Sequence, residues 1–174
     1  ADGRYVAFRS NASNLVSGDT NGVEDIFVHD RATLTTSRVS VASGGAQSNG
    51  PSDWLDMSAD GRYVAFASLG ATLVSNDTNS GWDSFVHDRV LQTTRRLNVA
   101  ADGTETTGYQ FASQVGISAD GRFIGIQSAA ALAPDDTNTL RDIYVVGGVN
   151  VAPTSASFLP IGGSGSVAVA FVYP

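Results

Sequence analysis

The chain has 174 residues, of which 42% are hydrophobic and 16% are charged, and its formal net charge is −7. This composition is that of a globular protein with a core and not of a disordered chain. The excess of acidic residues argues against nucleic acid as a partner. We expect no membrane span, because no apolar run reaches the length that one requires. The absence of cysteine excludes disulfides and thiolate metal sites.

The first segment of the chain recurs twice. ADGRYVAF occurs at residues 1–8 and 59–66, and ADGRFIGI occurs at 119–126. The Asp-Gly pair is typical of a tight turn, in which glycine adopts a positive φ at low cost. The apolar residues that follow predict a strand buried on both faces of its sheet. The aspartates of the three copies lie 58 and 60 residues apart, so the chain repeats with a period near 60, which indicates one supersecondary unit per repeat.

A polar loop follows each of these strands and carries the pattern D-T-N-x-x-x-D. The residues between the fixed positions differ among the three copies, whereas the two aspartates and the asparagine do not. The triplets are Asp19, Asn21 and Asp25, then Asp77, Asn79 and Asp83, then Asp136, Asn138 and Asp142. Positions that stay the same in all three copies indicate a shared structural or binding role.

Further strands are expected after the polar loops. DIFVHD and DSFVHD follow the first two loops directly, and TTSRVSV and TTRRLNV come next, rich in Thr and Val with alternation. PSDWLDMS and GYQFASQVGIS, which lead into the next Asp-Gly turn, supply a fourth strand. Four short strands per repeat, with almost no helical periodicity, predict an all-β fold of β-propeller blades, each with four antiparallel strands, and about three repeats in this chain.

The repeat resembles a known family. S-A-D-G-R-Y-V-A-F, D-I-F-V-H-D and T-T-x-R-V-S-V together are similar to the repeat of TolB-type β-propellers. The D-T-N-x-x-x-D insertion resembles a variant found in secreted bacterial propeller proteins, for which the resemblance implies a calcium-binding loop. The resemblance to the TolB-type repeat covers residues 1–148, which divide into repeats 1–57, 58–117 and 118–148. It implies the fold and not one activity, because propellers host binding, scaffolding and catalysis alike.

The remaining residues, 149–174, form a Gly/Ser/Pro-rich tail that ends in an apolar strand. TolB-type propellers usually have six blades, whereas this chain holds fewer than three complete repeats, since the third lacks its third strand. Two arrangements would cover the open sheet edges. Either the strand Val167–Tyr173 closes the ring beside the N-terminal strand, or a second copy of the chain completes the ring.

The three triplets predict a metal site. Two carboxylates and an amide oxygen at positions 1, 3 and 7 of a tight loop can converge on one point, in a spacing that resembles the first half of an EF-hand loop. Calcium takes six to eight oxygens, so backbone carbonyls and waters would complete the shell, and Glu24 adds a ligand in the first repeat only. A polar turn is the alternative, because Asp and Asn favour turns through their own hydrogen bonds. We expect Ca²⁺ in up to three sites.

Other chemically capable residues are interpreted as structural. His29 and His87 occupy equivalent places in FVHDR, and active sites tend to break the symmetry of a repeat. Asp30 and Asp88, which follow them, are expected to form ion pairs or turn caps at strand ends. No nucleophile elbow, zinc-protease motif or phosphate loop is present, so no catalytic residue is predicted.

The aromatic residues divide into core and surface positions. Trp54 lies in a strand segment and is expected in the core, whereas Trp82 lies within the second polar loop and is expected to be exposed, where it could stack on a sugar. Five aromatic residues at repeat-equivalent strand positions are also predicted to be core: Phe27, Tyr63, Phe66, Phe85 and Phe123.

Three functions remain open from the sequence. The first is a secreted, periplasmic or cell-surface propeller that calcium stabilises and that acts as a structural module or binds a protein or glycan. The second is a glycan-acting hydrolase or lyase with its site in the propeller channel, to which Asp30 and Asp88 could contribute. The third is a subunit of an extracellular assembly, with a homo-oligomer covering the sheet edges. The first is preferred, and an enzyme is less expected than a non-enzyme.

Overall fold

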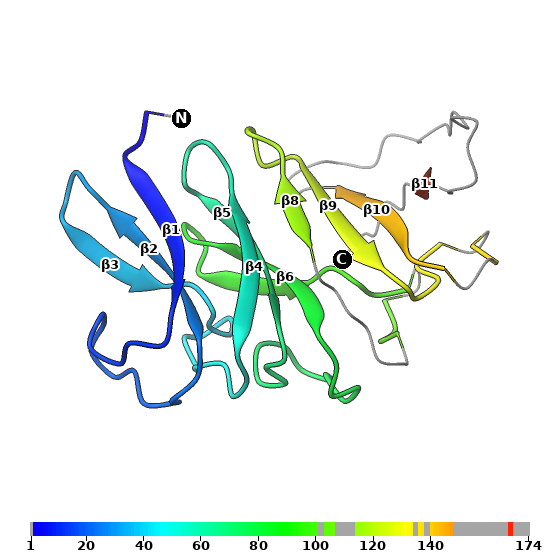
Figure 1. The fold of residues 1–174 in the computed structure, drawn as a ribbon, viewed down its shortest axis with the longest axis horizontal. Coiled ribbons are helices and arrows are strands. Elements are labelled where there is room, and N and C mark those ends of the chain that lie inside the picture. The colour runs from blue at the N-terminus through cyan, green and yellow to red at the C-terminus, as the bar shows by residue number, and fades with distance from the viewer. Residues whose placement is uncertain are drawn as a thin grey trace.

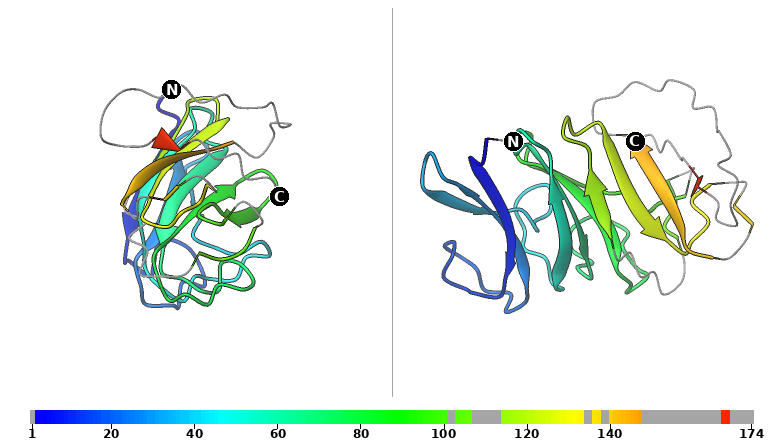
Figure 2. Two further views of the ribbon diagram at one scale, coloured as in Figure 1. Left: turned by 90° about the vertical axis from the view of Figure 1, so that its right-hand side faces the viewer. Right: turned by 45° about the horizontal axis from the view of Figure 1, so that its top comes forward.

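The computed structural model describes residues 2–100, 103–106, 114–133, 136–137 and 140–147, together with the backbone of 167–168. These residues form strands and turns in three consecutive sheets, which lie side by side in chain order (Figures 1 and 2). Among the described residues, no helix could cross a membrane.

The three sheets repeat one strand order. The first sheet runs β1-β2-β3, the second β4-β5-β6-β7, and the third β8-β9-β10-β11, and every neighbouring pair is antiparallel except β10 and β11. The expected all-β fold of propeller blades is therefore confirmed. The strands are β1 (Tyr5–Ser10), β2 (Asp25–Asp30), β3 (Thr35–Arg38), β4 (Ser52–Met57), β5 (Tyr63–Ser68), β6 (Asp83–Asp88), β7 (Thr93–Arg96), β8 (Val115–Ile117), β9 (Phe123–Ser128), β10 (Asp142–Gly147) and β11 (Val167–Ala168).

The sheets begin one strand earlier than the sequence repeats. β4 precedes the second Asp-Gly turn in the chain, yet it pairs with β5 across that turn. β8 pairs with β9 in the same way. Consecutive antiparallel strands pair most readily with their chain neighbours, so the tight turn joins the first two strands of each of these sheets.

The C-terminal strand lies in the third sheet. β11 pairs in parallel with β10, with Val167 opposite Ile143 and Ala168 opposite Tyr144. The expectation that this strand pairs beside the N-terminal strand is therefore not met by residues 167–168. The remainder of the expected strand, 169–173, lies outside the described residues. Ring closure stays a prediction.

The central sheet is buried on both faces, as expected for a blade between two neighbours. All six residues of β5 are buried, and its side chains alternate between two hydrophobic clusters. Val64 and Phe66 pack towards the first sheet, whereas Tyr63 and Ala65 pack towards the third. The equivalent strand β1 has no fully buried residue, because a neighbouring sheet covers only one of its faces.

Two expectations for aromatic residues are wrong. Phe123 is 40% exposed although Tyr63, at the equivalent position, is buried, since no described blade follows the third sheet. Trp54 is 38% exposed, because the strand that carries it is irregular at that point. Phe27, Phe66 and Phe85 are fully buried, as predicted.

In the second and third ADGR segments, the turn glycine packs on the tyrosine ring of the preceding sheet. A Cβ added to Gly61 would lie 2.2 Å from the ring of Tyr5, and one added to Gly121 would lie 2.4 Å from the ring of Tyr63. Both glycines also have φ of +71°, which disfavours any side chain. We call this arrangement the glycine–tyrosine contact, and it joins adjacent sheets at the same place in each repeat.

Candidate functional site

The first two polar loops each bring their triplet together at one end of a sheet. In the first cluster, Asp19 and Asn21 come from the loop before β2, and Asp25 begins β2. In the second cluster, Asp77 and Asn79 come from the loop before β6, which Asp83 begins. The expected convergence of the repeated side chains is therefore present in the first two loops.

An arginine lies at the centre of the first cluster. Arg38, the last residue of β3, places one terminal nitrogen 2.9 Å from Oδ1 of Asp19 and 3.1 Å from Oδ2 of Asp25. The same nitrogen donates to Oε1 of Gln47 at 3.0 Å. Ser40 donates a hydrogen bond to Asp25 as well. The protein thus supplies its own cation between these two carboxylates.

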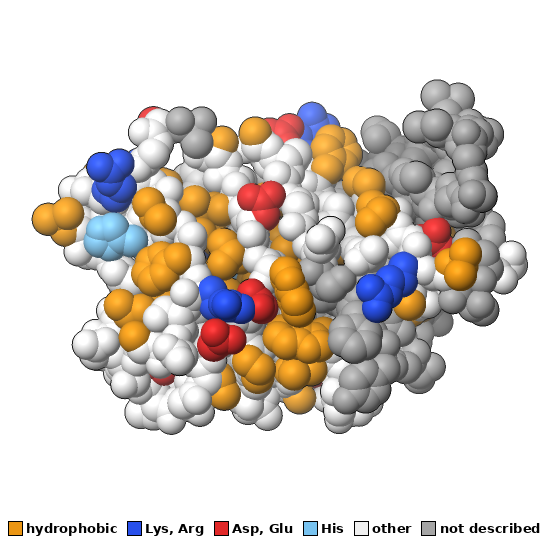
Figure 3. All heavy atoms as spheres, in the orientation of Figure 1, with side chains coloured by type: hydrophobic (Ala, Val, Ile, Leu, Met, Phe, Trp, Pro, Cys, Tyr) orange, Lys and Arg blue, Asp and Glu red, His pale blue; other side chains and the backbone are white. Residues whose placement is uncertain are grey.

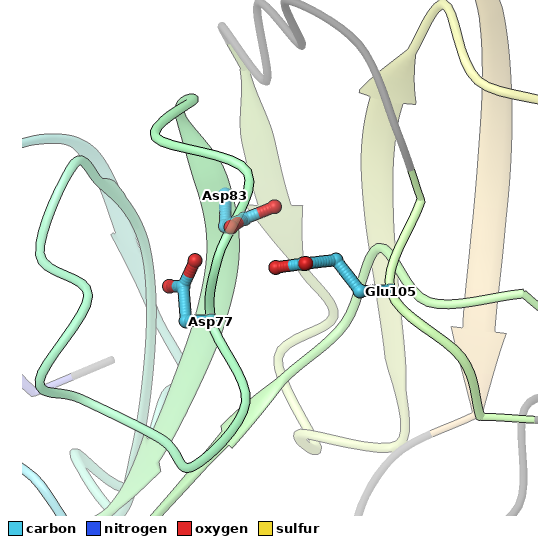
Figure 4. A group of neighbouring side chains, drawn as sticks. All are labelled: Asp77, Asp83 and Glu105. Carbon is cyan, nitrogen blue, oxygen red and sulfur yellow. The ribbon is translucent and has the colours of Figure 1, made fainter.

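The second cluster repeats this arrangement with one more acid. A terminal nitrogen of Arg96 lies 3.4 Å from both Asp77 and Asp83 and 2.7 Å from Glu105, which takes the place of Gln47. Figure 4 shows the three carboxylates pointing towards one another, with Glu105 on the segment that follows β7. Three carboxylates face one guanidinium here, so the formal charge is −2, against −1 in the first cluster.

The extra charge affects protonation in the second cluster. Burial and, after it, the charge of Asp83 together raise the pKa of Asp77 to about 6, although Arg96 acts in the opposite direction. Burial would also raise the pKa of Glu105, but hydrogen bonds from Thr78 and Arg96 lower it to about 2. Asp77 is therefore the carboxylate whose negative charge is least well compensated.

In the first two triplets, the asparagine directs its amide nitrogen at the neighbouring aspartate. Nδ2 of Asn79 donates to Asp83 at 3.2 Å, and Oδ1 accepts the backbone N–H of Gly81 at 2.7 Å. Asn21 makes the same pair of contacts, with Asp25 and with the N–H of Val23. Both amide oxygens accept a backbone hydrogen bond that stabilises the loop turn, and either amide would have to turn over to direct its oxygen at the carboxylates. Their role as calcium ligands stays a prediction.

The second cluster fits a calcium ion in its donor set. Oxygens bound to one calcium at about 2.4 Å are at most about 4.8 Å apart, and ligand atoms of Asp77, Asp83 and Glu105 lie within 4.8 Å of one another. The first cluster has one carboxylate fewer, and its arginine lies closer to the two aspartates.

In the third loop, Asp136 accepts a hydrogen bond from the hydroxyl of Tyr144, and Asp142 begins β10. Asn138 lies outside the described residues.

Four residues of these clusters were not among the predicted ligands. Arg38 and Arg96 lie 58 residues apart, as do Gln47 and Glu105. The repeat spacing is therefore the signal that could have identified them. They come from strands and hairpins that follow the polar loop, so only the folded chain places them beside the triplets.

The acids considered for a channel active site have structural partners. Two hydrogen bonds from Arg4 lower the pKa of Asp30. Burial opposes ionisation of Asp88, but Arg62 and backbone N–H groups hold its pKa below the ordinary value. Both acids therefore stay ionised at strand ends, as expected.

The two histidines also have structural contacts. Nδ1 of His87 lies 2.9 Å from Oγ1 of Thr94, and burial lowers the pKa of His87 to about 4. Nδ1 of His29 lies 3.0 Å from Oγ1 of Thr36. The same contact in two repeats agrees with a repeat-encoded strand role for both residues.

Comparison with known proteins shows weak structural similarity. The sequence matches no family model and no curated protein. TolB from Acinetobacter baumannii is 17% identical, with a TM-score of 0.43 over 86% of this chain and 28% of that protein. A candidate TolB from Agrobacterium tumefaciens is 16% identical, with a TM-score of 0.45 over 84% of this chain and 42% of that protein. The chain spans less than half of either protein, and its propeller-like architecture rests on its own strand order and register.

Proposed function

We propose that this chain is a secreted, periplasmic or cell-surface β-propeller interaction module of TolB-type repeats, and that its second cluster binds calcium. The observation that carries the calcium proposal is the imbalance of three carboxylates against one guanidinium. A divalent ion compensates such an excess, and oxygen ligands of this kind suit calcium. Asp77, Asp83 and Glu105 would hold the ion, and its charge would tie the polar loop to the hairpin that follows β7.

Calcium is expected to raise the melting temperature of the chain. An ion that binds only the folded state adds about 2.7 kcal/mol at a free concentration one hundred times the dissociation constant. For a chain of this size, that corresponds to a rise of roughly 5–10 °C over the value in excess EDTA. Thermal unfolding followed by circular dichroism, in calcium and in EDTA, measures the difference.

The repeat offers matched variants for this test. Glu105→Gln gives the second cluster the donor set of the first, so the calcium-dependent rise should largely disappear. Gln47→Glu gives the first cluster the donor set of the second and should add a further calcium-dependent rise. Equal melting temperatures in calcium and EDTA for the unaltered chain would remove the calcium proposal and leave the arginine as the only cation of each cluster.

A specific observation favours the assembly subunit as a second candidate function. The glycine–tyrosine contact joins the first sheet to the second and the second to the third. At the two outer sheets, one side of this contact has no described partner. Phe123, at the tyrosine position of the third sheet, is 40% exposed. A Cβ on Gly3, at the glycine position of the first sheet, would meet only Arg31, at 3.6 Å. A second copy of the chain would bring its Gly3 turn onto Phe123 and continue the same packing.

The mass in solution tests this second candidate. We expect the chain to be a dimer or larger by light scattering, and Phe123→Ser to shift it towards the monomer. Leu34→Ser is the control, because Leu34 is also exposed but lies in the turn between β2 and β3. A monomeric chain at high concentration, or an assembly that Phe123→Ser leaves intact, would contradict the proposal.

A further inference from the structure

An exposed pair of tryptophans lies between the polar loops and the first strand of the second sheet. Trp54 belongs to β4, and Trp82 immediately precedes β6. Their rings meet edge to face, with centroids 4.9 Å apart. Trp54 is 38% exposed and Trp82 is partly exposed. Two adjacent aromatic rings that both keep part of their surface accessible form a patch that a partner can contact.

The backbone is distorted at the point that presents Trp54. The register between β4 and β5 shifts between Asp53 and Asp56, as in a β-bulge. Trp54 itself has φ of +44°, a region that bulky side chains rarely adopt and that costs about 1–3 kcal/mol. Bulges commonly redirect a side chain beside a functional site. Here the bulge coincides with an indole that is exposed to solvent. The positive φ of Trp54 lowers stability without adding a buried contact.

Charged groups continue the surface from Trp54 towards the first sheet. Asp53, next to Trp54, pairs with Arg9 of β1, and Arg9 in turn lies 3.5 Å from Glu24. The side chains of Arg9, Asp53 and Glu24 are 42%, 27% and 43% exposed. In Figure 3, acidic and basic side chains lie beside a group of hydrophobic ones over the region where β1 and β4 are neighbours. The surface therefore offers hydrogen-bond donors and acceptors next to an aromatic face.

These residues break the repeat that the rest of the fold obeys. Trp82 corresponds to Glu24 in the first repeat and to Arg141 in the third. Arg9 corresponds to Ala67 in the second repeat. Because each sheet forms with a different residue at these positions, the shared architecture does not require Trp82 or Arg9. These positions are therefore free to serve a surface that belongs to this one region.

We propose that Trp54 and Trp82, with Arg9, Asp53 and Glu24 at their edge, bind a neutral oligosaccharide. A sugar ring has an apolar C–H face that stacks on an indole and hydroxyl groups that both donate and accept hydrogen bonds. One guanidinium and two carboxylates match those hydroxyls, and their net negative charge disfavours an anionic glycan. This proposal does not rest on calcium binding at the second cluster.

Indole fluorescence tests the proposal directly, because Trp54 and Trp82 are the only two tryptophans of the chain. Titration with neutral hexasaccharides (cello-, xylo-, malto- and chito-oligosaccharides) should give a saturable change in emission with at least one of them, both in calcium and in EDTA. Isothermal titration calorimetry with the same sugar measures the affinity.

Variants then locate the binding. Trp54→Gly, which fits the positive φ, and Trp82→Glu, which restores the residue of the first repeat, should each weaken binding at least about tenfold. Leu91→Ala, an exposed apolar position in the turn between β6 and β7, should not. Circular dichroism melts confirm that each variant is folded. The proposal is overturned if no sugar of the panel binds or if the tryptophan variants bind as well as the unaltered chain. It is also overturned if, in the same fluorescence assay, only a proline-rich peptide or choline changes the emission.

Discussion

Arg96→Met is expected to lower the free energy of unfolding by about 3–5 kcal/mol in calcium-free solution. The side chain of Arg96 is 7% exposed and provides the positive charge among Asp77, Asp83 and Glu105. Removing one partner of a buried ionic cluster leaves the remaining charges without compensation, which costs more than the pair itself contributes. Methionine keeps much of the volume of the arginine stem, so the variant removes the charge and its hydrogen bonds without opening a large cavity. Urea unfolding at neutral pH measures the change.

The first cluster supplies the comparison for this variant. Arg38→Met should cost less than Arg96→Met, because two carboxylates and not three lose their cation. Arg31→Met, at an exposed arginine that donates to the carbonyl of Gly3, should cost little. Calcium should restore more stability to Arg96→Met than to the unaltered chain, because the position of the guanidinium becomes free for the ion. A loss under about 1 kcal/mol, or a calcium response no larger than that of the unaltered chain, would contradict this account.

Gly61→Ala is expected to destabilise the chain by about 2–5 kcal/mol. The positive φ of Gly61 costs an alanine about 1–2 kcal/mol, and forcing a methyl group against the ring of Tyr5 adds about 1–3 kcal/mol, as in an overpacked core. The ring has little room to move, because the guanidinium carbons of Arg4 and Arg89 lie 4.8 Å and 4.9 Å from its centroid. Urea unfolding again measures the change.

Gly3→Ala separates the two causes of that effect. Gly3 occupies the same Asp-Gly turn with φ of +73°, but a Cβ at that position would meet no atom closer than 3.6 Å. Its substitution should therefore cost only the backbone part. The difference between the two variants is the contribution of the glycine–tyrosine contact between sheets. Equal losses at Gly3 and Gly61 would show that the contact contributes nothing and that the glycines serve the turn alone.

Strand order was predictable from the sequence because its signals are local. The Asp-Gly turn and the apolar run after it lie within eight residues, and each recurs at the repeat spacing. The burial of β5 on both faces followed from its composition. The exposure of Phe123 did not, because it depends on whether another blade covers the sheet and not on the strand itself.

The candidate site was predictable only in part. The triplets do converge, as their fixed spacing indicated, but their charge partners come from strand ends and hairpins further along the chain. The asparagines illustrate the limit. The loop sequence shows that the asparagines are present. Which amide atom faces the aspartate, oxygen or nitrogen, depends on the backbone groups and carboxylates that surround the side chain in the folded protein.

The sequence by itself determined the period of the chain, the type and order of its strands and the positions of three acidic loops. The strands and loops depend on neighbours within a few residues, and the period follows from the recurrence of these local patterns. The tertiary structure alone decided that arginines occupy the acidic loops, that the turn glycines also hold adjacent sheets together, and that Trp54 points outwards beside Trp82. These features arise between segments distant in the chain, where packing and charge compensation depend on which surfaces the fold brings into contact.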